Sequence, residues 1–240
     1  MQMNGLWENN MVTVTGTVTI EAKYSHRVYG EGFYTFSLAS ERLSNYTDVL
    51  PIMVSERLLA LSEHGLQKGS RVCVTGQLRS YNHFNGKKNR LVLTVFAREL
   101  SFAEEDTLVP CNEIFLNGYI CKKPIYRKTP FGREIADILV AVNRAYHKSD
   151  YIPCIVWGRN ARYVGEAAVG IFISVKGRIQ SRTYQKRTGD MIEERVAYEV
   201  SVSQMELDGT KETQKEPVTK DTMGEESFPL LRKQELKRFE

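Results

Sequence analysis

The sequence contains a duplicated pattern that divides most of the chain into two similar halves. The pattern Asp-x-x-Pro-x-x-Val occurs at residues 48–54 and again at residues 150–156, an offset of 102 residues. A period of about 100 residues is the size of a domain, so it indicates two related domains rather than a solenoid. We place the first at residues 1–108 and the second at residues 109–207. Further pairs match at nearly the same offset: Asn10 and Gly16 with Asn112 and Gly118, and Gly69 and Gly76 with Gly170 and Gly177.

Each half has the pattern of a small β-barrel. Residues 12–20 alternate apolar and polar side chains and contain many β-branched residues, as strands with one buried face do. One short helix interrupts the strands of each half: Ser55 caps a helix over residues 56–64, and residues 160–164 form its counterpart. Three strands, a helix and two strands is the plan of the OB-fold, a Greek-key barrel. The sequence therefore predicts an all-β chain of two tandem OB-fold barrels.

The composition changes after residue 207. Residues 208–226 are rich in Lys, Glu, Thr, Gly and Pro and almost lack apolar side chains, which predicts a disordered tail over residues 208–240. Within the tail, the segment Phe228–Phe239 places four apolar side chains on one stripe of a helix. Two interpretations stay open for this segment: a short helix that docks on a partner protein, and a frayed end.

Several function classes have no signature in the sequence. The phosphate loop, the His-Glu-x-x-His motif and the Gly-x-Ser-x-Gly motif are missing, so we expect no catalysis, cofactor or metal. The scattered cysteines and the lack of a signal peptide favour a reducing cytoplasm. No apolar run reaches the ~20 residues of a membrane helix. Asp48 and Asp150 begin strands, and we assign them a turn role. The cysteines are Cys73, Cys111, Cys121 and Cys154.

Positive charge gathers in the second half of the chain. Residues 112–207 contain 15 Lys and Arg against 10 Asp and Glu, a net charge of +5 (15 − 10). Residues 1–111 contain 11 of each kind and are therefore neutral. This distribution favours a polyanionic partner for the second domain.

The second domain also carries aromatic residues that the first lacks at the matching positions. Tyr151 and Trp157 lie an even number of residues apart, so on a strand both point to the same face. The first domain has Val49 and Ser55 instead. Aromatic rings stack unpaired bases and nearby cations bind phosphates, which together make a site for single-stranded nucleic acid. The alternative is that the rings fill the barrel. The nucleic-acid interpretation predicts that the second domain carries most of the affinity.

A string of motifs runs through residues 112–207. It comprises Asn112-x-Ile-x-Leu-x-Gly118, Ala141-Val-Asn-Arg144, Asp150-Tyr-Ile-Pro-Cys-Ile-Val-Trp-Gly158 and Gly177-Arg-Ile-Gln-Ser-Arg-Thr-Tyr184. This string resembles the bacterial single-stranded-DNA-binding protein family. The resemblance implies an OB-fold that wraps single-stranded DNA without base-sequence preference. It also implies an assembly with four OB domains, which a chain with two of them reaches as a homodimer.

The resemblance also implies roles for single residues. Base stacking is expected from the aromatic residues Tyr146, Tyr151, Trp157 and Tyr184. Phosphate contacts are expected from the basic residues around them, Arg144, Arg178, Arg182, Lys148 and Arg159. The first domain departs from the family because it lacks these aromatics, which leaves two alternatives open: it serves dimerisation, or it holds DNA weakly through Arg79, Tyr81, Phe84, Lys87 and Lys88.

The end of the chain departs from the family. Its members usually close with an acidic tip that recruits other DNA-processing enzymes, whereas this chain ends in Leu236-Lys-Arg-Phe-Glu240. The departure keeps a second interpretation open. In it, the chain is an OB-fold interaction module, such as a primosome or mediator component, whose main partner is another protein.

Overall fold

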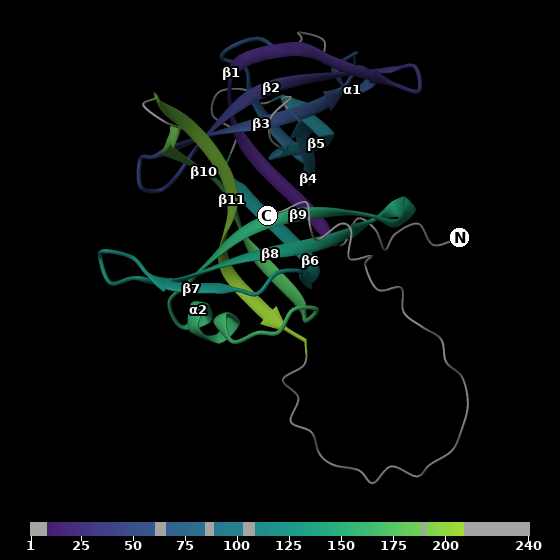
Figure 1. Cartoon of the computed structure of the whole chain (residues 1–240). Coiled ribbons are helices and arrows are strands. Elements are labelled where there is room, and N and C mark those ends of the chain that lie inside the picture. The colour runs from purple at the N-terminus through teal and green to yellow at the C-terminus, as the bar shows by residue number, and fades with distance from the viewer. Residues whose placement is uncertain (1–8, 61–65, 85–88, 103–108, 189–190, 209–240) are drawn as a thin grey trace, which may run out of the picture. The chain divides into compact units, whose positions relative to one another are not determined.

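The computed structural model describes residues 9–60, 66–84, 89–102, 109–188 and 191–208 (Figure 1). Most of these residues lie in strands of one continuous hydrogen-bonded sheet. Within these ranges no helix is long and apolar enough to cross a membrane. The predicted disordered tail after residue 208, with its segment Phe228–Phe239, lies outside the described residues.

The first barrel consists of β1 to β5 and a short helix. Its elements are β1 (Asn10–Val28), β2 (Glu31–Glu41), β3 (Thr47–Ser55), α1 (Glu56–Ala60), β4 (Arg71–Phe84) and β5 (Asn89–Phe102). β1 pairs with β2, β2 with β3, and β4 with both β5 and β1, all antiparallel. A parallel pairing of β3 with β5, Ile52 opposite Val95, closes the barrel. This topology confirms the predicted OB-fold.

The second barrel repeats the topology. Its elements are β6 (Asn112–Ile120), β7 (Ile125–Lys128), β8 (Glu134–Arg144), the 3-10 turn η2 (Ala145–His147), β9 (Lys148–Trp157), α2 (Gly158–Gly165), β10 (Phe172–Thr188) and β11 (Met191–Leu207). The matching parallel pair, Cys154 opposite Val200, closes it. The first strand of this repeat is divided into β6 and β7, which both pair with β8. Pro124 lies in the gap, where a missing N–H interrupts the ladder.

The two short helices begin close to where the sequence places them. The Leu58 N–H donates to Ser55 Oγ at 3.3 Å, so Ser55 caps α1 as predicted. The last residues of that predicted helix, 61–64, lie outside the described part of the chain. α2 begins at Gly158, two residues before the predicted start at Asn160. The exact division between the domains, at residue 108, stays a prediction.

Two glycines shared by the repeats stand where strands cross closely. A Cβ atom on Gly16 would lie 2.1 Å from the carbonyl oxygen of Ala39, and one on Gly118 would lie 2.4 Å from that of Ala141. These distances are far below any van der Waals contact. A side chain at either position would therefore force the crossing strands apart, which explains why both halves carry glycine here.

The two barrels are joined through their first strands. β1 and β6 pair antiparallel, with Val12 opposite Ile114, its own match in the repeat. The paired stretches Asn10–Val14 and Asn112–Leu116 match each other and run in opposite directions, so the junction has an approximate twofold axis. β4, β1, β6 and β10 are therefore neighbours in one sheet, and both barrels belong to one compact unit, residues 1–209.

Asp48 binds across this junction to the second barrel. The residue is fully buried (0% exposed) near the start of β3. Arg42 donates to the carboxylate from Nε and Nη2 at 2.6 Å each. The backbone N–H of Ser181 donates to Oδ1 at 2.6 Å, and the Ser181 hydroxyl lies 3.0 Å from the same oxygen. An aspartate of one barrel thus holds the backbone of β10 in the other.

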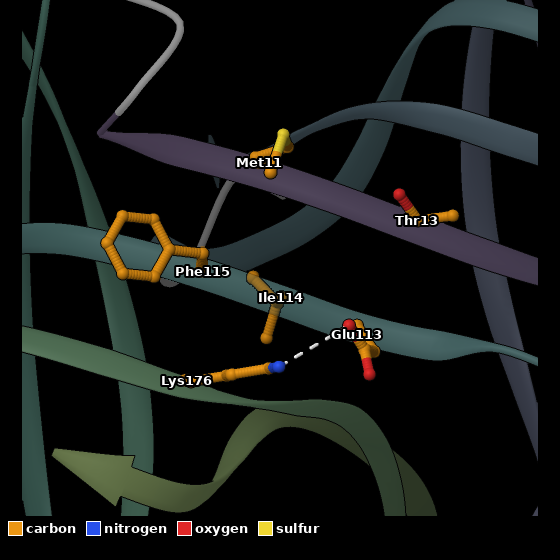
Figure 2. A pocket seen from close by; sticks show the side chains of 6 residues that line it. All are labelled: Met11, Thr13, Glu113, Ile114, Phe115 and Lys176. Atoms are coloured by element: carbon orange, nitrogen blue, oxygen red, sulfur yellow. Dashed lines mark ion pairs between the residues drawn. The ribbon is translucent and has the colours of Figure 1, made fainter.

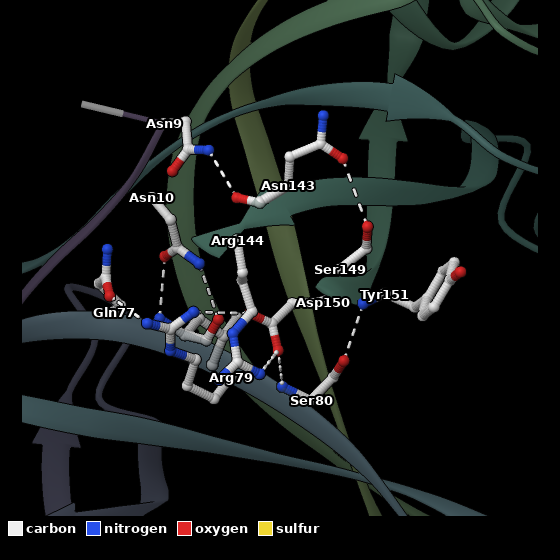
Figure 3. A network of polar contacts seen from close by, with 11 residues as sticks. Asn9, Asn10, Gln77, Arg79, Ser80, Asn143, Arg144, Ser149, Asp150 and Tyr151 are labelled. Atoms are coloured by element: carbon white, nitrogen blue, oxygen red, sulfur yellow. Dashed lines mark hydrogen bonds and ion pairs between the residues drawn. The ribbon is translucent and has the colours of Figure 1, made fainter. Parts of the chain in front are cut away.

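Asp150 makes the reciprocal contact with the first barrel (Figure 3). Its buried carboxylate accepts the backbone N–H of Ser80 at 2.7 Å and Nη1 of Arg79 at 2.9 Å, both from β4. Arg144 of its own barrel lies 3.4 Å from Oδ1. The next residue, Tyr151, donates its backbone N–H to Ser80 Oγ at 2.7 Å, and its ring points away from this network.

Asp48 and Asp150, each with the arginine side chains and the serine N–H group that bind its carboxylate, form a roughly symmetric pair, which we call the aspartate clamp. The turn role assigned to both aspartates is therefore wrong, because each carboxylate is buried against the other barrel. Burial by itself raises the pKa of Asp48. Hydrogen bonds from Arg42 and Ser181 outweigh it and hold the pKa below its ordinary value. The junction thus keeps this carboxylate charged.

Removing one carboxylate of the clamp should destabilise the protein strongly. Asp48→Ala leaves Arg42 and the Ser181 N–H without their acceptor, and breaking a buried pair costs about 3–5 kcal/mol. Asp137→Ala is the matched control, because Asp137 and Arg127 form an exposed ion pair worth less than about 1 kcal/mol. Urea titrations give the free energy of unfolding of each variant. Equal losses in the two variants would contradict the role of the clamp.

The lowered pKa of Asp48 predicts the pH range in which the clamp contributes. A carboxyl with a lowered folded pKa adds stability that is fully present above its unfolded pKa, about 3.9, and is lost as the pH falls through the folded pKa. We expect the stability difference between wild type and Asp48→Asn to be constant above about pH 5 and to shrink below about pH 4. Thermal melts at a series of pH values measure it. A difference that persists unchanged at low pH would refute this.

Candidate nucleic-acid interface

Tyr151 and Trp157 lie on the outward face of β9. Burial alternates from Asp150 to Cys154, with Ile152 and Cys154 inside the barrel, and the next two residues are both buried. β9 pairs with β8 in continuous register, so the even spacing brings both rings to the same face. Trp157 is 37% exposed, and its indole N–H donates to Ser201 Oγ on β11 at 3.1 Å.

β10 extends this face with basic and aromatic residues. Arg178, Arg182 and Tyr184 occupy alternate positions that point outward, because the intervening Ile179 is buried. Arg178 lies directly opposite Ser201, the acceptor of the indole N–H. The structure thus brings together five residues that the sequence singles out. We call their surface the aromatic-basic face; it consists of Tyr151, Trp157, Arg178, Arg182 and Tyr184.

An acidic residue that sequence reasoning missed lies in the middle of this face. Glu199 of β11 is 8% exposed and accepts Gln180 Nε2 at 2.8 Å. Arg182 Nε lies 3.9 Å from the same carboxylate, and the Arg182 guanidinium lies 5.8 Å from the centre of the Tyr184 ring. Glu199 therefore holds a predicted phosphate contact beside a predicted stacking ring. The signal in the sequence is the alternation along β11, which puts Glu199 and Ser201 on one side of the strand.

The other predicted residues of the second barrel lie at the two ends of β9. Tyr146 is 91% exposed and has a left-handed φ of 60° in η2, so its ring stands on a strained turn rather than on the sheet. Lys148, the first residue of β9, and Arg159, in α2, are both exposed. Arg144 differs from them, because its guanidinium takes part in the clamp beside Asp150.

The residues predicted to contact DNA in the first barrel have different surroundings. Arg79 is largely buried, and its guanidinium donates to Asp150 in the clamp. Tyr81 of β4 is 45% exposed. The others lie outside the described part of the chain: the side chain of Phe84, Lys87 and Lys88.

A hollow lies over the junction of the barrels (Figure 2). Met11 and Phe115 face each other across the β1–β6 pairing, and Thr13 faces Glu113 in the same way. Lys176 of β10 lies 3.8 Å from Glu113. The hollow has a volume of about 240 Å³ and is lined by residues of both barrels. We call it the junction hollow.

Comparison with known proteins adds a family match. The single-strand binding protein family matches the chain twice, over residues 9–103 and 111–208. Single-stranded DNA-binding protein 1 of Staphylococcus aureus (strain COL) is 36% identical over 85 residues, which are 32% of this chain and 51% of the relative. Single-stranded DNA-binding protein A of Bacillus subtilis is 33% identical over 88 residues, 34% of this chain and 51% of the relative. The chain thus spans about half the length of the curated relatives it matches.

A solved structure has the same fold. The wild-type single-stranded DNA binding protein from Thermus aquaticus superposes with a TM-score of 0.67, covering 88% of this chain and 96% of that one. The sequences are 19% identical, so this likeness concerns the fold alone.

Proposed function

The chain belongs to the single-strand binding protein family, and from this premise we propose that it binds single-stranded DNA without base-sequence preference. The observation that carries the proposal is the aromatic-basic face, where Trp157 and Tyr184 share one side of the barrel with Arg178 and Arg182. Aromatic rings stack on any base, and guanidinium groups bind the phosphates that all sequences share. Neither contact therefore depends on the identity of the base.

The geometry supports a role for each part of this surface. The hydrogen bond to Ser201 orients the Trp157 ring before a base arrives, which lowers the entropy cost of stacking. Tyr146 and Lys148 extend the surface at one end of β9, and Arg159 extends it at the other. Arg79 belongs to the clamp instead, because its guanidinium is buried against Asp150.

The wider role follows from the family. We infer that the protein acts on exposed single strands in DNA replication, recombination or repair in the cytoplasm, and that it carries out no chemical step of its own. The family match over both halves and relatives named for DNA binding support this inference.

Replacing both Trp157 and Tyr184 by Ala should weaken the binding of oligo-dT, by roughly 1–3 kcal/mol for each lost stack. Fluorescence anisotropy titrations measure the affinity. Tyr163→Ala is the matched control: Tyr163 is an exposed (47%) tyrosine of the same barrel on α2, and this variant should bind as the wild type does. A folded double variant with undiminished affinity would overturn the site assignment.

A second proposal concerns assembly: two chains form a homodimer with four OB-fold barrels through the junction hollow. Met11 is 52% exposed and lies opposite Phe115 on the sheet that both barrels share. Glu113 and Lys176, of opposite charge, flank this apolar pair. A second copy placed about a twofold axis presents the same patch, so apolar meets apolar and each charge finds its opposite.

At micromolar concentration, light scattering should give twice the 27.5 kDa mass of the chain. Met11→Glu puts a charge at the apolar centre and should produce monomers. Ile125→Glu, at another exposed (63%) apolar position, should leave the dimer intact. A monomeric wild type would refute the dimer, and a dimeric Met11→Glu variant would refute the surface.

A further inference from the structure

The place occupied by Trp157 in the second barrel has a counterpart in the first. Three strand positions define it: Trp157 on β9, Ile135 opposite it on β8, and Ser201 on β11, which accepts the indole N–H. The parallel pairing that closes each barrel makes Phe96 of β5 the counterpart of Ser201. The register of the strands, rather than the sequence offset, thus shows what the first barrel carries there.

At this counterpart the first barrel holds two rings instead of one. Phe33 of β2 lies opposite Ser55 of β3, so Phe33 takes the Ile135 position and Ser55 takes the Trp157 position. The Phe33 and Phe96 rings are 5.8 Å apart between centroids, with planes at 42°. A central ring with two non-aromatic neighbours is therefore replaced by a central serine with a ring on either side.

His26 and Arg98 extend this pair of rings. The His26 ring stacks on Phe33, with centroids 5.3 Å apart and planes at 18°. The Arg98 guanidinium lies 5.1 Å from the centre of the Phe96 ring. Both His26 and Arg98 are exposed. We call the four residues His26, Phe33, Phe96 and Arg98 the first-barrel ring cluster.

The ring cluster lies outside the hydrophobic core. Phe36 and Val95 point into the barrel and are 2% and 1% exposed, whereas Phe33 and Phe96 are half-buried on the outer face. The core that fills both barrels contains Phe36 and Val95. The second barrel makes the same strand pairings with the non-aromatic residues Ile135 and Ser201 at the positions of Phe33 and Phe96. Barrel closure therefore does not require the rings.

Positive charge connects the ring cluster with the second barrel. Partial burial of the guanidinium and, second to it, the positive charge of Arg144 in the other barrel lower the pKa of Arg98, so the two cations are close enough to repel each other. Arg144 in turn lies 3.4 Å from Asp150, and the next residue is Tyr151 of the aromatic-basic face. The cation of the ring cluster thus lies beside the Asp150 side of the clamp.

We propose that the first-barrel ring cluster stacks an unpaired base of the DNA strand that the second barrel binds. The inference rests on the proposed function and extends it to a barrel for which the sequence predicts only weak contacts from other residues. Phe33, Phe96 and the stacked His26 provide the aromatic surface, and Arg98 provides the cation for the adjoining phosphate. Both barrels then contribute to affinity, in contrast to the expectation that the second carries most of it.

The test exchanges residues between matching positions. The double variant Phe33→Ile, Phe96→Ser gives the first barrel the side chains that the second barrel has at these positions, Ile135 and Ser201. For oligo-dT long enough to contact both barrels, we expect a loss of roughly 5- to 160-fold in affinity, the ratio for about 1–3 kcal/mol per stacked base. Adding Ser55→Trp recreates the arrangement of the second barrel and should restore affinity. For short oligo-dT, which contacts the second barrel alone, we expect the same affinity in all variants.

A second variant covers the case in which the double exchange fails to fold. His26→Ala removes an exposed ring that leaves no cavity, and it should weaken the binding of long oligo-dT in the same direction. Thermal melts establish that each variant is folded. Tyr163→Ala again serves as the control that should bind as the wild type does.

The outcomes separate this inference from the proposed function. Weaker binding after the double exchange, with recovery after Ser55→Trp, supports the ring cluster as a binding site. If Trp157→Ala weakens binding while the double exchange and His26→Ala do not, the ring cluster is structural and the inference is wrong. If the wild type itself binds no oligo-dT, the proposed function fails, and the inference that rests on it fails too.

Discussion

The aspartate clamp is the interaction on which the arrangement of the two barrels depends. Asp48 and Asp150 are fully buried, and each binds a backbone N–H group of the other barrel. A buried carboxylate that loses its partners is strongly destabilising, so each charge requires the other barrel to be in place. Hydrophobic contact between the barrels lacks this directionality. The clamp therefore selects one register of β1 against β6 from those that apolar packing alone allows.

The same contacts link the junction to the aromatic-basic face. Tyr151 directly follows Asp150 and donates its backbone N–H to Ser80 of the first barrel. The first barrel thus sets the position of Tyr151, a ring of the second barrel to which we assign base stacking only as a proposal. This explains how the two halves share their framework and differ on their surfaces. The aspartate, proline and valine of the repeat serve the barrel and its junction, whereas Trp157 and Ser55 stand at matching positions and serve different surfaces.

The sequence predicts the fold because its signals are local. The repeat and the alternation along the strands indicate two OB-folds, and the same alternation places Tyr151 and Trp157 on one face. Local signals do not predict the clamp, because Asp48 and Ser181 are 133 residues apart in the sequence. An aspartate at the start of a strand does not indicate which distant backbone N–H it binds. The ring cluster is missed by the sequence comparison for another reason. Comparison at constant offset finds only Ser55 where the second half has Trp157, while the replacement rings stand on the two adjacent strands.

Charge differs between the two halves of the clamp, and the difference favours one path for a DNA strand between the barrels. Two arginine side chains bind the buried carboxylate of Asp150, those of Arg79 and Arg144, whereas one, that of Arg42, binds the carboxylate of Asp48. On the side of Asp48, Glu199 adds a second buried carboxylate, which acts on Arg42 and lies 3.9 Å from Arg182. The side of Asp150 also adjoins the first-barrel ring cluster through Arg98. Under the proposed function, a phosphate placed near Arg98 and Arg144 would relieve the repulsion of these like charges, so a strand that crosses on the side of Asp150 would gain electrostatic energy there.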